Sequence, residues 1–146
     1  MGVHGVFDTT VHKTNEWLHD IMQRLGWSDP HRAWAALRAV LHVLRDRLGV
    51  HEAVALGAQL PLLVRGAYYE GWVPARDPVR IRHESQLVER VAAEMRGYRD
   101  VIDPAEVTRA VLDVLAEHVS SGAIDHIVRV MPRDLRQLFP APHASP

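Results

Sequence analysis

Apolar residues recur at helical spacing along nearly the whole chain, in four stretches that are followed by four more. Trp17, Ile21 and Leu25 form one such stripe, and Val107, Val111 and Val114 form another. The stripes predict helices at about residues 7–25, 30–48, 52–60 and 62–68, and again at 85–95, 104–119, 124–131 and 132–139. This pattern predicts an all-α protein.

Residues that favour helix ends stand at the expected boundaries. Asp29-Pro30 and Asp103-Pro104 each combine a capping side chain with a proline in the first turn. Gly26 and Gly97 stand where a helix would end in a left-handed residue. Between the two sets of helices, residues 73–83 contain two prolines and no clear period, so we expect an extended, superficial segment.

The two sets are related in sequence. Arg38–Leu44 returns 71 places later as Arg109–Leu115 with six of seven residues identical, and Pro61 and Pro132 have the same offset. Such self-similarity predicts an internal duplication. We expect a single domain over 1–146, a compact helical bundle with pseudo-twofold symmetry: a first repeat at about 7–72, a linker at 73–83, a second repeat at 84–139 and a frayed tail at 140–146.

Composition removes several classes of function. The chain has no cysteine, so thiolate metal sites, disulfides and cysteine nucleophiles are excluded. The net charge of −1 does not suggest a nucleic-acid-binding surface. No apolar run approaches the ~20 residues that span a bilayer, and the first residues lack the features of a secretion signal. We therefore expect a soluble cytoplasmic protein that binds neither nucleic acid nor membrane.

Three stretches carry a family resemblance. Gln59–Trp72, preceded by Leu37–Leu48 and followed by Met131–Phe139, resembles the bacterial family catalogued as domain of unknown function 2267 over about residues 7–139. The resemblance implies a bacterial, all-helical, duplicated domain, and it supplies no established reaction. Met131 replaces the leucine usual before the second proline, a volume-conserving change.

The clearest departure from the repeat lies at the end of its first copy. Where the second copy stops at Phe139, the first continues through Tyr68, Tyr69 and Trp72 into a segment with several arginines. These aromatic and basic side chains form a candidate interaction or anion-binding surface, because they can stack on a flat group or pair with an anion. Its members are Arg65, Tyr68, Tyr69, Trp72, Arg76, Arg80 and Arg82. The alternative is that the aromatic residues fill the seam between the repeats and the arginines are solvated.

Two further sets of residues have a functional and a structural interpretation. Arg65 and Arg136 each stand four residues after a proline that begins a helix. They could form two equivalent anion-binding sites, or each could bond to a carboxylate or to helix-end carbonyls in its own half. His12, Glu16 and His19 share one helical face with spacing that a metal ion can use, but this is also the polar face of the helix. The structural interpretation is favoured for both sets.

No catalytic signature accompanies the repeat. Phosphate-binding glycine loops, paired-histidine zinc motifs and nucleophile elbows are missing, and we expect no cofactor and no enzymatic activity. DNA binding through a helix-turn-helix is disfavoured, because the outward side chains would bring negative charge to the DNA phosphates. These side chains are Glu106, Asp113 and Glu117. The sequence favours a protein-interaction or adaptor module that binds an unknown protein or another copy of itself. The alternative is a small-molecule or anion-binding protein with a pocket between the halves.

Overall fold

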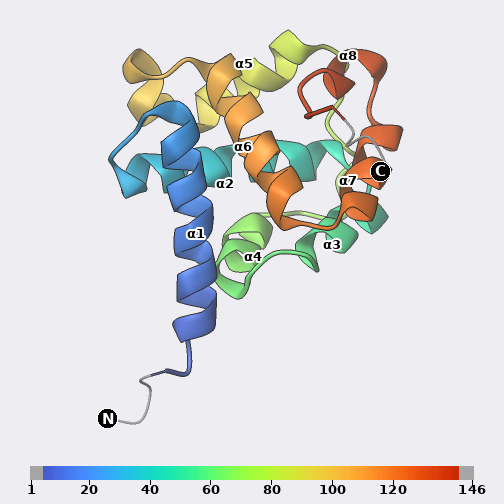
Figure 1. The fold of residues 1–146 in the computed structure, drawn as a ribbon. Coiled ribbons are helices and arrows are strands. Elements are labelled where there is room, and N and C mark those ends of the chain that lie inside the picture. Colours follow the sequence, from blue (N-terminus) through green and yellow to red (C-terminus); the bar gives the residue numbers. More distant parts are fainter. Residues whose placement is uncertain (1–4, 142–146) are drawn as a thin grey trace.

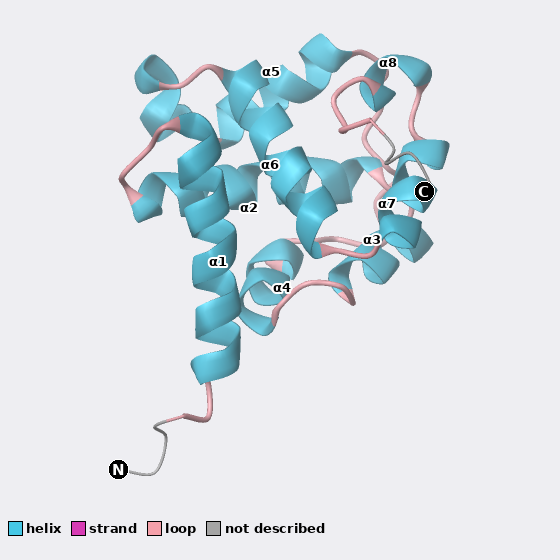
Figure 2. Ribbon diagram, viewed as in Figure 1, coloured by secondary structure: helices cyan, strands magenta, loops and turns pink. Residues whose placement is uncertain are grey.

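The computed structural model describes residues 5–141, and these fold into helices joined by short loops (Figures 1 and 2). No strand occurs within this range. The helices are α1 (Asp8–Leu25), α2 (Pro30–Arg47), α3 (Val50–Gly57), α4 (Leu62–Tyr69), α5 (Glu84–Glu94), the 3₁₀ helix η1 (Arg96–Val101), α6 (Pro104–His118), α7 (Ser121–Val130) and α8 (Arg133–Arg136). The predicted all-α fold is confirmed.

The two helices that contain the repeated heptapeptide are at the centre of the molecule. In Figure 1, α6 crosses α2, while α1, α5 and α4 surround this pair. The apolar residues of the heptapeptide are buried in both copies: Ala39, Val40, Leu41, Val43 and Leu44, and Ala110, Val111, Leu112, Val114 and Leu115. The most similar stretches of the chain therefore supply the middle of the core.

Both central helices begin as the sequence predicts. The Asp29 carboxylate accepts a hydrogen bond from the His31 N–H at 2.9 Å, and the Asp103 carboxylate accepts one from the Ala105 N–H at 3.1 Å. Each aspartate precedes a proline at the first helical position, where the missing N–H costs nothing. These caps fix where α2 and α6 enter the core.

Of the two glycines expected to end a helix, only Gly26 does so. Gly26 ends α1 in the left-handed conformation, with φ of 67°, but Gly97 has no positive φ and lies inside η1. Helix α5 ends earlier because Met95 is buried and its carbonyl accepts the Tyr98 N–H at 2.8 Å, which turns the chain into the 3₁₀ helix. The prediction that Gly97 closes a helix was wrong.

Element bounds repeat with the sequence offset in the shorter helices. Val50 begins α3 and Ser121 begins α7, 71 positions later, and Leu62 and Arg133 begin α4 and α8 with the same offset. Helix α3 is displaced from the predicted range, since it starts directly after Gly49 and ends at Gly57. The tail predicted to fray lies mostly outside the described residues, which end at residue 141.

Candidate interaction site

Side chains of α2 hold the last turn of α4. The Ala67 carbonyl accepts a hydrogen bond from His42 Nε2 at 2.6 Å. Arg45 Nη1 donates to the carbonyls of Tyr68 and Glu70 at 2.7 and 2.9 Å. The last carbonyls of a helix have no partner within the helix, so these bonds satisfy acceptors that would otherwise be orphaned. Helix α2 thereby fixes the start of the segment that follows α4.

Arg45 is the buried cation of this arrangement. Its side chain is only 5% exposed, and Nε donates to Asp46 Oδ1 at 2.8 Å in addition to the two bonds from Nη1. A buried guanidinium is tolerated where acceptors surround it, as these three do. Arg45 could not be predicted from local sequence, because two of its three acceptors are backbone carbonyls 23 and 25 residues away.

Tyr68 is not on the surface, so its assignment to the candidate interaction surface was wrong. The residue is fully buried, and its hydroxyl donates to the Ala53 carbonyl at 2.7 Å. Burial raises the pKa of the Tyr68 phenol far above its ordinary value, and the neighbouring Tyr69 raises it further. Tyr68 ties α4 to α3 and is inaccessible to a partner.

Tyr69 and Trp72 lie between the core and the surface. Both are partly buried and pack against the core, with their ring centroids 5.4 Å apart. The Tyr69 ring lies so close to Gly57 that a Cβ at that position would collide with it. Each ring therefore has one side on the body of the protein, and the contacts of Tyr69 with Gly57, Tyr68 and Trp72 all lie within the first half of the chain.

Arg65 is engaged by the chain itself. Nε donates to the Gly57 carbonyl and Nη2 to the Leu60 carbonyl, each at 2.9 Å. Arg136 does the same in the second half, where Nε donates to the Met131 carbonyl at 3.0 Å. These are the helix-end carbonyls that the structural interpretation named. Arg65 also lines a recess with Lys13 and His118, away from the arginines that follow α4.

The connector, which we define as residues 70–83 between α4 and α5, is attached to α2. The Val79 N–H donates to the Asp46 carbonyl at 2.8 Å, and Arg47 Nε donates to the Ile81 carbonyl at 2.9 Å. Ile81 is 1% exposed, so the expectation of a superficial linker was wrong at this residue. A sequence signal was present, since Val79 and Ile81 alternate with two arginines as in a half-buried extended segment.

The outer side of the connector is basic. Arg76, Arg80 and Arg82 are exposed, and none of them forms an ion pair within residues 5–141. Of the residues proposed from the sequence, the structure therefore brings Trp72 and these three arginines onto one segment. Arg65 and Tyr68 are used internally.

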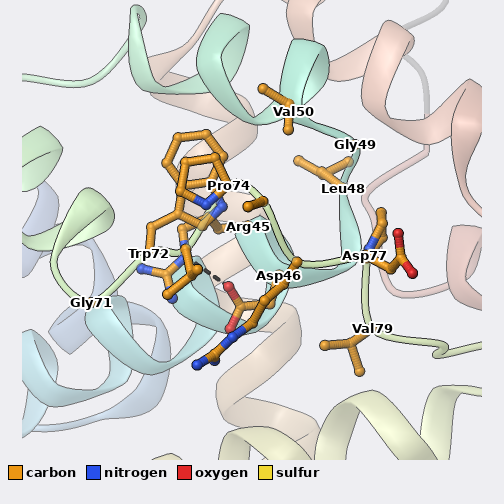
Figure 3. A pocket seen from close by; sticks show the side chains of 14 residues that line it. Arg45, Asp46, Leu48, Gly49, Val50, Gly71, Trp72, Pro74, Asp77 and Val79 are labelled. Atoms are coloured by element: carbon orange, nitrogen blue, oxygen red, sulfur yellow. Dashed lines mark hydrogen bonds and ion pairs between the residues drawn. The ribbon is translucent and has the colours of Figure 1, made fainter.

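A cavity of about 300 Å³ lies between the connector and the junction of α2 with α3 (Figure 3). The charged side chains around it are Arg45 and Asp46, joined by the dashed line in Figure 3, together with Arg76 and Asp77. Trp72 supplies an aromatic wall. Two basic and two acidic groups balance, so the lining suits a neutral or zwitterionic group better than a multiply charged anion.

The predicted metal candidates are not assembled into a site. His12 Nε2 lies 3.0 Å from Glu16 Oε1 on the exposed face of α1. Within the described part of the chain, no three histidine or carboxylate side chains are placed to hold a metal ion.

Asp20 and His118 form a contact that was not predicted from the sequence. His118 Nε2 lies 2.7 Å from Asp20 Oδ2, and the His118 ring stacks on Trp17 with centroids 4.8 Å apart. His118 of α6 and Asp20 of α1 are 98 positions apart, so no local sequence pattern predicts this contact. This contact attaches α1 to the end of α6.

These features define an all-helical protein in which an exposed basic segment is bonded to the central helix α2. The family model described as "Uncharacterized conserved protein (DUF2267)" matches residues 14–138, and the chain belongs to that family. No curated protein matches the chain. None of the helices in the described range is both long enough and apolar enough to cross a bilayer.

Proposed function

We propose that this protein is a non-enzymatic interaction or adaptor module whose contact surface is the connector, with Trp72, Arg76, Arg80 and Arg82 as its principal side chains. The observation that carries the proposal is that the connector is both exposed and fixed. Hydrogen bonds with α2 hold Val79 and Ile81, while the three arginine side chains are exposed and form no ion pair within residues 5–141. A preorganised surface loses less conformational entropy on binding than a loose one.

The partner is a second protein or another copy of this chain. Arginine and tryptophan are the residue types most often found at the energetic centre of protein interfaces, and Trp72 lies beside the arginine-bearing segment. The modest net charge of −1 disfavours nucleic acid as the partner. We expect the protein to act in the bacterial cytoplasm.

We also propose that the helical body arose by duplication. The equal offsets of helix starts, the shared burial of the two heptapeptides and the matched arginine contacts support this origin. Residues 7–72 and 84–139 would then be related copies joined by residues 73–83, so that most of the connector lies outside the repeat. A surface that departs from the repeat is free to acquire a binding role.

A ligand-binding function is the second candidate, and the connector cavity favours it. Its volume of about 300 Å³ is at the lower end of small-molecule sites. The ligand would contact Trp72, Arg76 and Asp77 rather than Arg65 or Tyr68. A ligand that binds only the folded state raises the melting temperature, so a thermal-shift screen of small metabolites tests this candidate.

The interaction function is tested by site-specific photo-crosslinking in cells that express the protein. A photoreactive residue at the exposed Val73 should form covalent adducts with one partner or with a second copy. The same residue at Ala93, exposed on α5, is the control and should not form them. Identical adducts from both positions, or none from Val73, would contradict the proposal.

A further inference from the structure

The connector has two distinct sides over residues 79–82. Val79 is half-buried and Ile81 is buried, whereas Arg80 and Arg82 are exposed. This alternation is that of an extended chain, in which successive side chains point to opposite faces. The inner pair packs against the body and the outer pair faces solvent.

The backbone of the same residues is also divided. The N–H of Val79 and the carbonyl of Ile81 are bonded to α2. In an extended chain, the peptide groups of the intervening residue point to the opposite edge. The Arg80 N–H makes no backbone hydrogen bond within residues 5–141. The Arg82 N–H is already used, since it donates to Gln86 Oε1 of α5 at 2.9 Å. One edge is thus occupied by α2, and the other is open at Arg80.

Two acidic side chains, one close to Arg82 in sequence and one close in space to its neighbours, are already engaged. Glu84 pairs with Arg109, and Asp134 lies 3.6 Å from His83 Nδ1 and accepts the Glu84 N–H at 2.8 Å. Arg80 and Arg82 are exposed and form no ion pair within residues 5–141, so their charge is available to a partner. Alternate residues of an extended chain lie about 7 Å apart, which matches the spacing of alternate side chains on a neighbouring strand.

We propose that the open edge of residues 79–82 binds an extended acidic segment of a partner protein, whose carboxylates at alternate positions pair with Arg80 and Arg82. The segment lies beside the connector as an added strand, with its backbone bonded to Arg80. This inference rests on the proposed interaction function and specifies the partner's chemistry. The short edge makes the contact weak, with specificity coming from the charge spacing.

The probe is a fluorescein-labelled peptide in which glutamate alternates with threonine, and its binding to the full chain is measured by fluorescence anisotropy at low salt. A peptide of the same composition with its glutamates in one block is the first comparison. The alternating peptide should bind more tightly, because only its carboxylates share the register of the two arginines.

Paired variants locate the site. The double variant Arg80→Gln/Arg82→Gln should lower the affinity about tenfold, since two exposed ion pairs contribute roughly 1.4 kcal/mol together. The double variant Arg90→Gln/Arg96→Gln removes the same charge from exposed positions on α5 and at the start of η1, and should leave the affinity unchanged. Hydrogen exchange should show protection of the Arg80 amide only with the alternating peptide.

Three results would overturn the inference: equal binding of the alternating and block peptides, equal losses in the two double variants, or equal binding of a single-stranded oligothymidylate of the same charge. The last would identify a general polyanion surface. A negative result with the acidic peptide is distinguishable from a negative result for the interaction function as a whole. Adducts from Val73 without peptide binding would retain the module and exclude its acidic partner.

Discussion

Arg65 and Arg136 make matching hydrogen bonds 71 positions apart. Arg65 Nη2 donates to the carbonyls of Leu60 and Ala58 at 2.9 and 3.5 Å, and Arg136 donates from Nε to Met131 and from Nη2 to Arg129 at 3.0 and 3.4 Å. The four acceptors are themselves related by the same offset. Each arginine thus closes the turn between two short helices in its own half.

Replacing Arg65 by glutamine should lower the free energy of unfolding by about 2 kcal/mol, because carbonyls at the end of α3 lose a charged donor. Urea denaturation followed by circular dichroism measures the change. Arg76→Gln, an exposed connector arginine, is the control and should stay within about 0.5 kcal/mol of the parent. If both variants unfold like the parent protein, Arg65 is not a structural residue.

Arg45→Gln should be more damaging, by about 3 kcal/mol, because it leaves the Tyr68 and Glu70 carbonyls without a donor whose side chain is only 5% exposed. The connector should also become more accessible to protease, which is measurable by limited digestion. Arg38→Gln is a matched control on the same helix, since Arg38 is 39% exposed and pairs with Glu70 at 3.5 Å. Its cost should remain under about 1 kcal/mol. Equal costs would mean that burial of Arg45 contributes nothing.

The buried Tyr68 phenol predicts a loss of stability at high pH. Its pKa is raised in the folded protein and ordinary in the unfolded one, so above about pH 10 the unfolded chain releases a proton that the folded chain retains. The free energy of unfolding should then fall by up to about 1.4 kcal/mol per pH unit from this group alone. Tyr68→Phe should remove that part of the decline while costing about 1 kcal/mol at neutral pH. Parallel pH profiles for parent and variant between pH 9 and 11 would be evidence against this assignment.

Gly57 and Tyr69 form a pair that a double-mutant cycle can test. Alanine normally favours a helix by about 1 kcal/mol over glycine, but at Gly57 its Cβ collides with the Tyr69 ring. Gly57→Ala alone should therefore fail to stabilise the protein and should alter tryptophan fluorescence, because Tyr69 contacts Trp72. In the background of Tyr69→Ala, the same change should stabilise it. Stabilisation of equal size in both backgrounds would show that the ring does not occupy this position.

The helical body could be predicted from sequence because its signals are local. Stripes of apolar residues and the Asp29 and Asp103 caps act within one or two turns, and the structure places these elements accordingly. The displaced end of α3 was not predicted. The N–H groups of Gln59 and Leu60 bond three residues back, to the Leu56 and Gly57 carbonyls at 2.9 and 3.2 Å, which tightens the end of the helix, and Arg65 Nε also donates to the Gly57 carbonyl.

The candidate site was predicted less well, because burial in short segments depends on distant partners. Tyr68 and Tyr69 are adjacent on a helix of eight residues, which is too short for periodicity to decide which ring points inward. Arg45 bonds to carbonyls 23 and 25 positions away, and the Ile81 carbonyl is bonded by Arg47 across 34 positions.

The single position at which the repeated heptapeptides differ also illustrates this limit. His42 bonds to the Ala67 carbonyl, whereas Asp113, its counterpart, lies 3.4 Å from Arg24 of α1. The ten apolar residues around them are buried alike. The side chains of His42 and Asp113 therefore bond to different neighbouring helices, α4 and α1, a difference that only the assembled fold reveals.

The Thr10 hydroxyl oxygen of α1 accepts the Leu63 N–H at 3.2 Å, across a separation of 53 residues. A nascent chain leaves the ribosome from its amino end, so the residue that satisfies the first turn of α4 emerges long before α4 does. Trimming a recombinant version at about residue 11 would thus remove a group on which a helix in the middle of the chain depends.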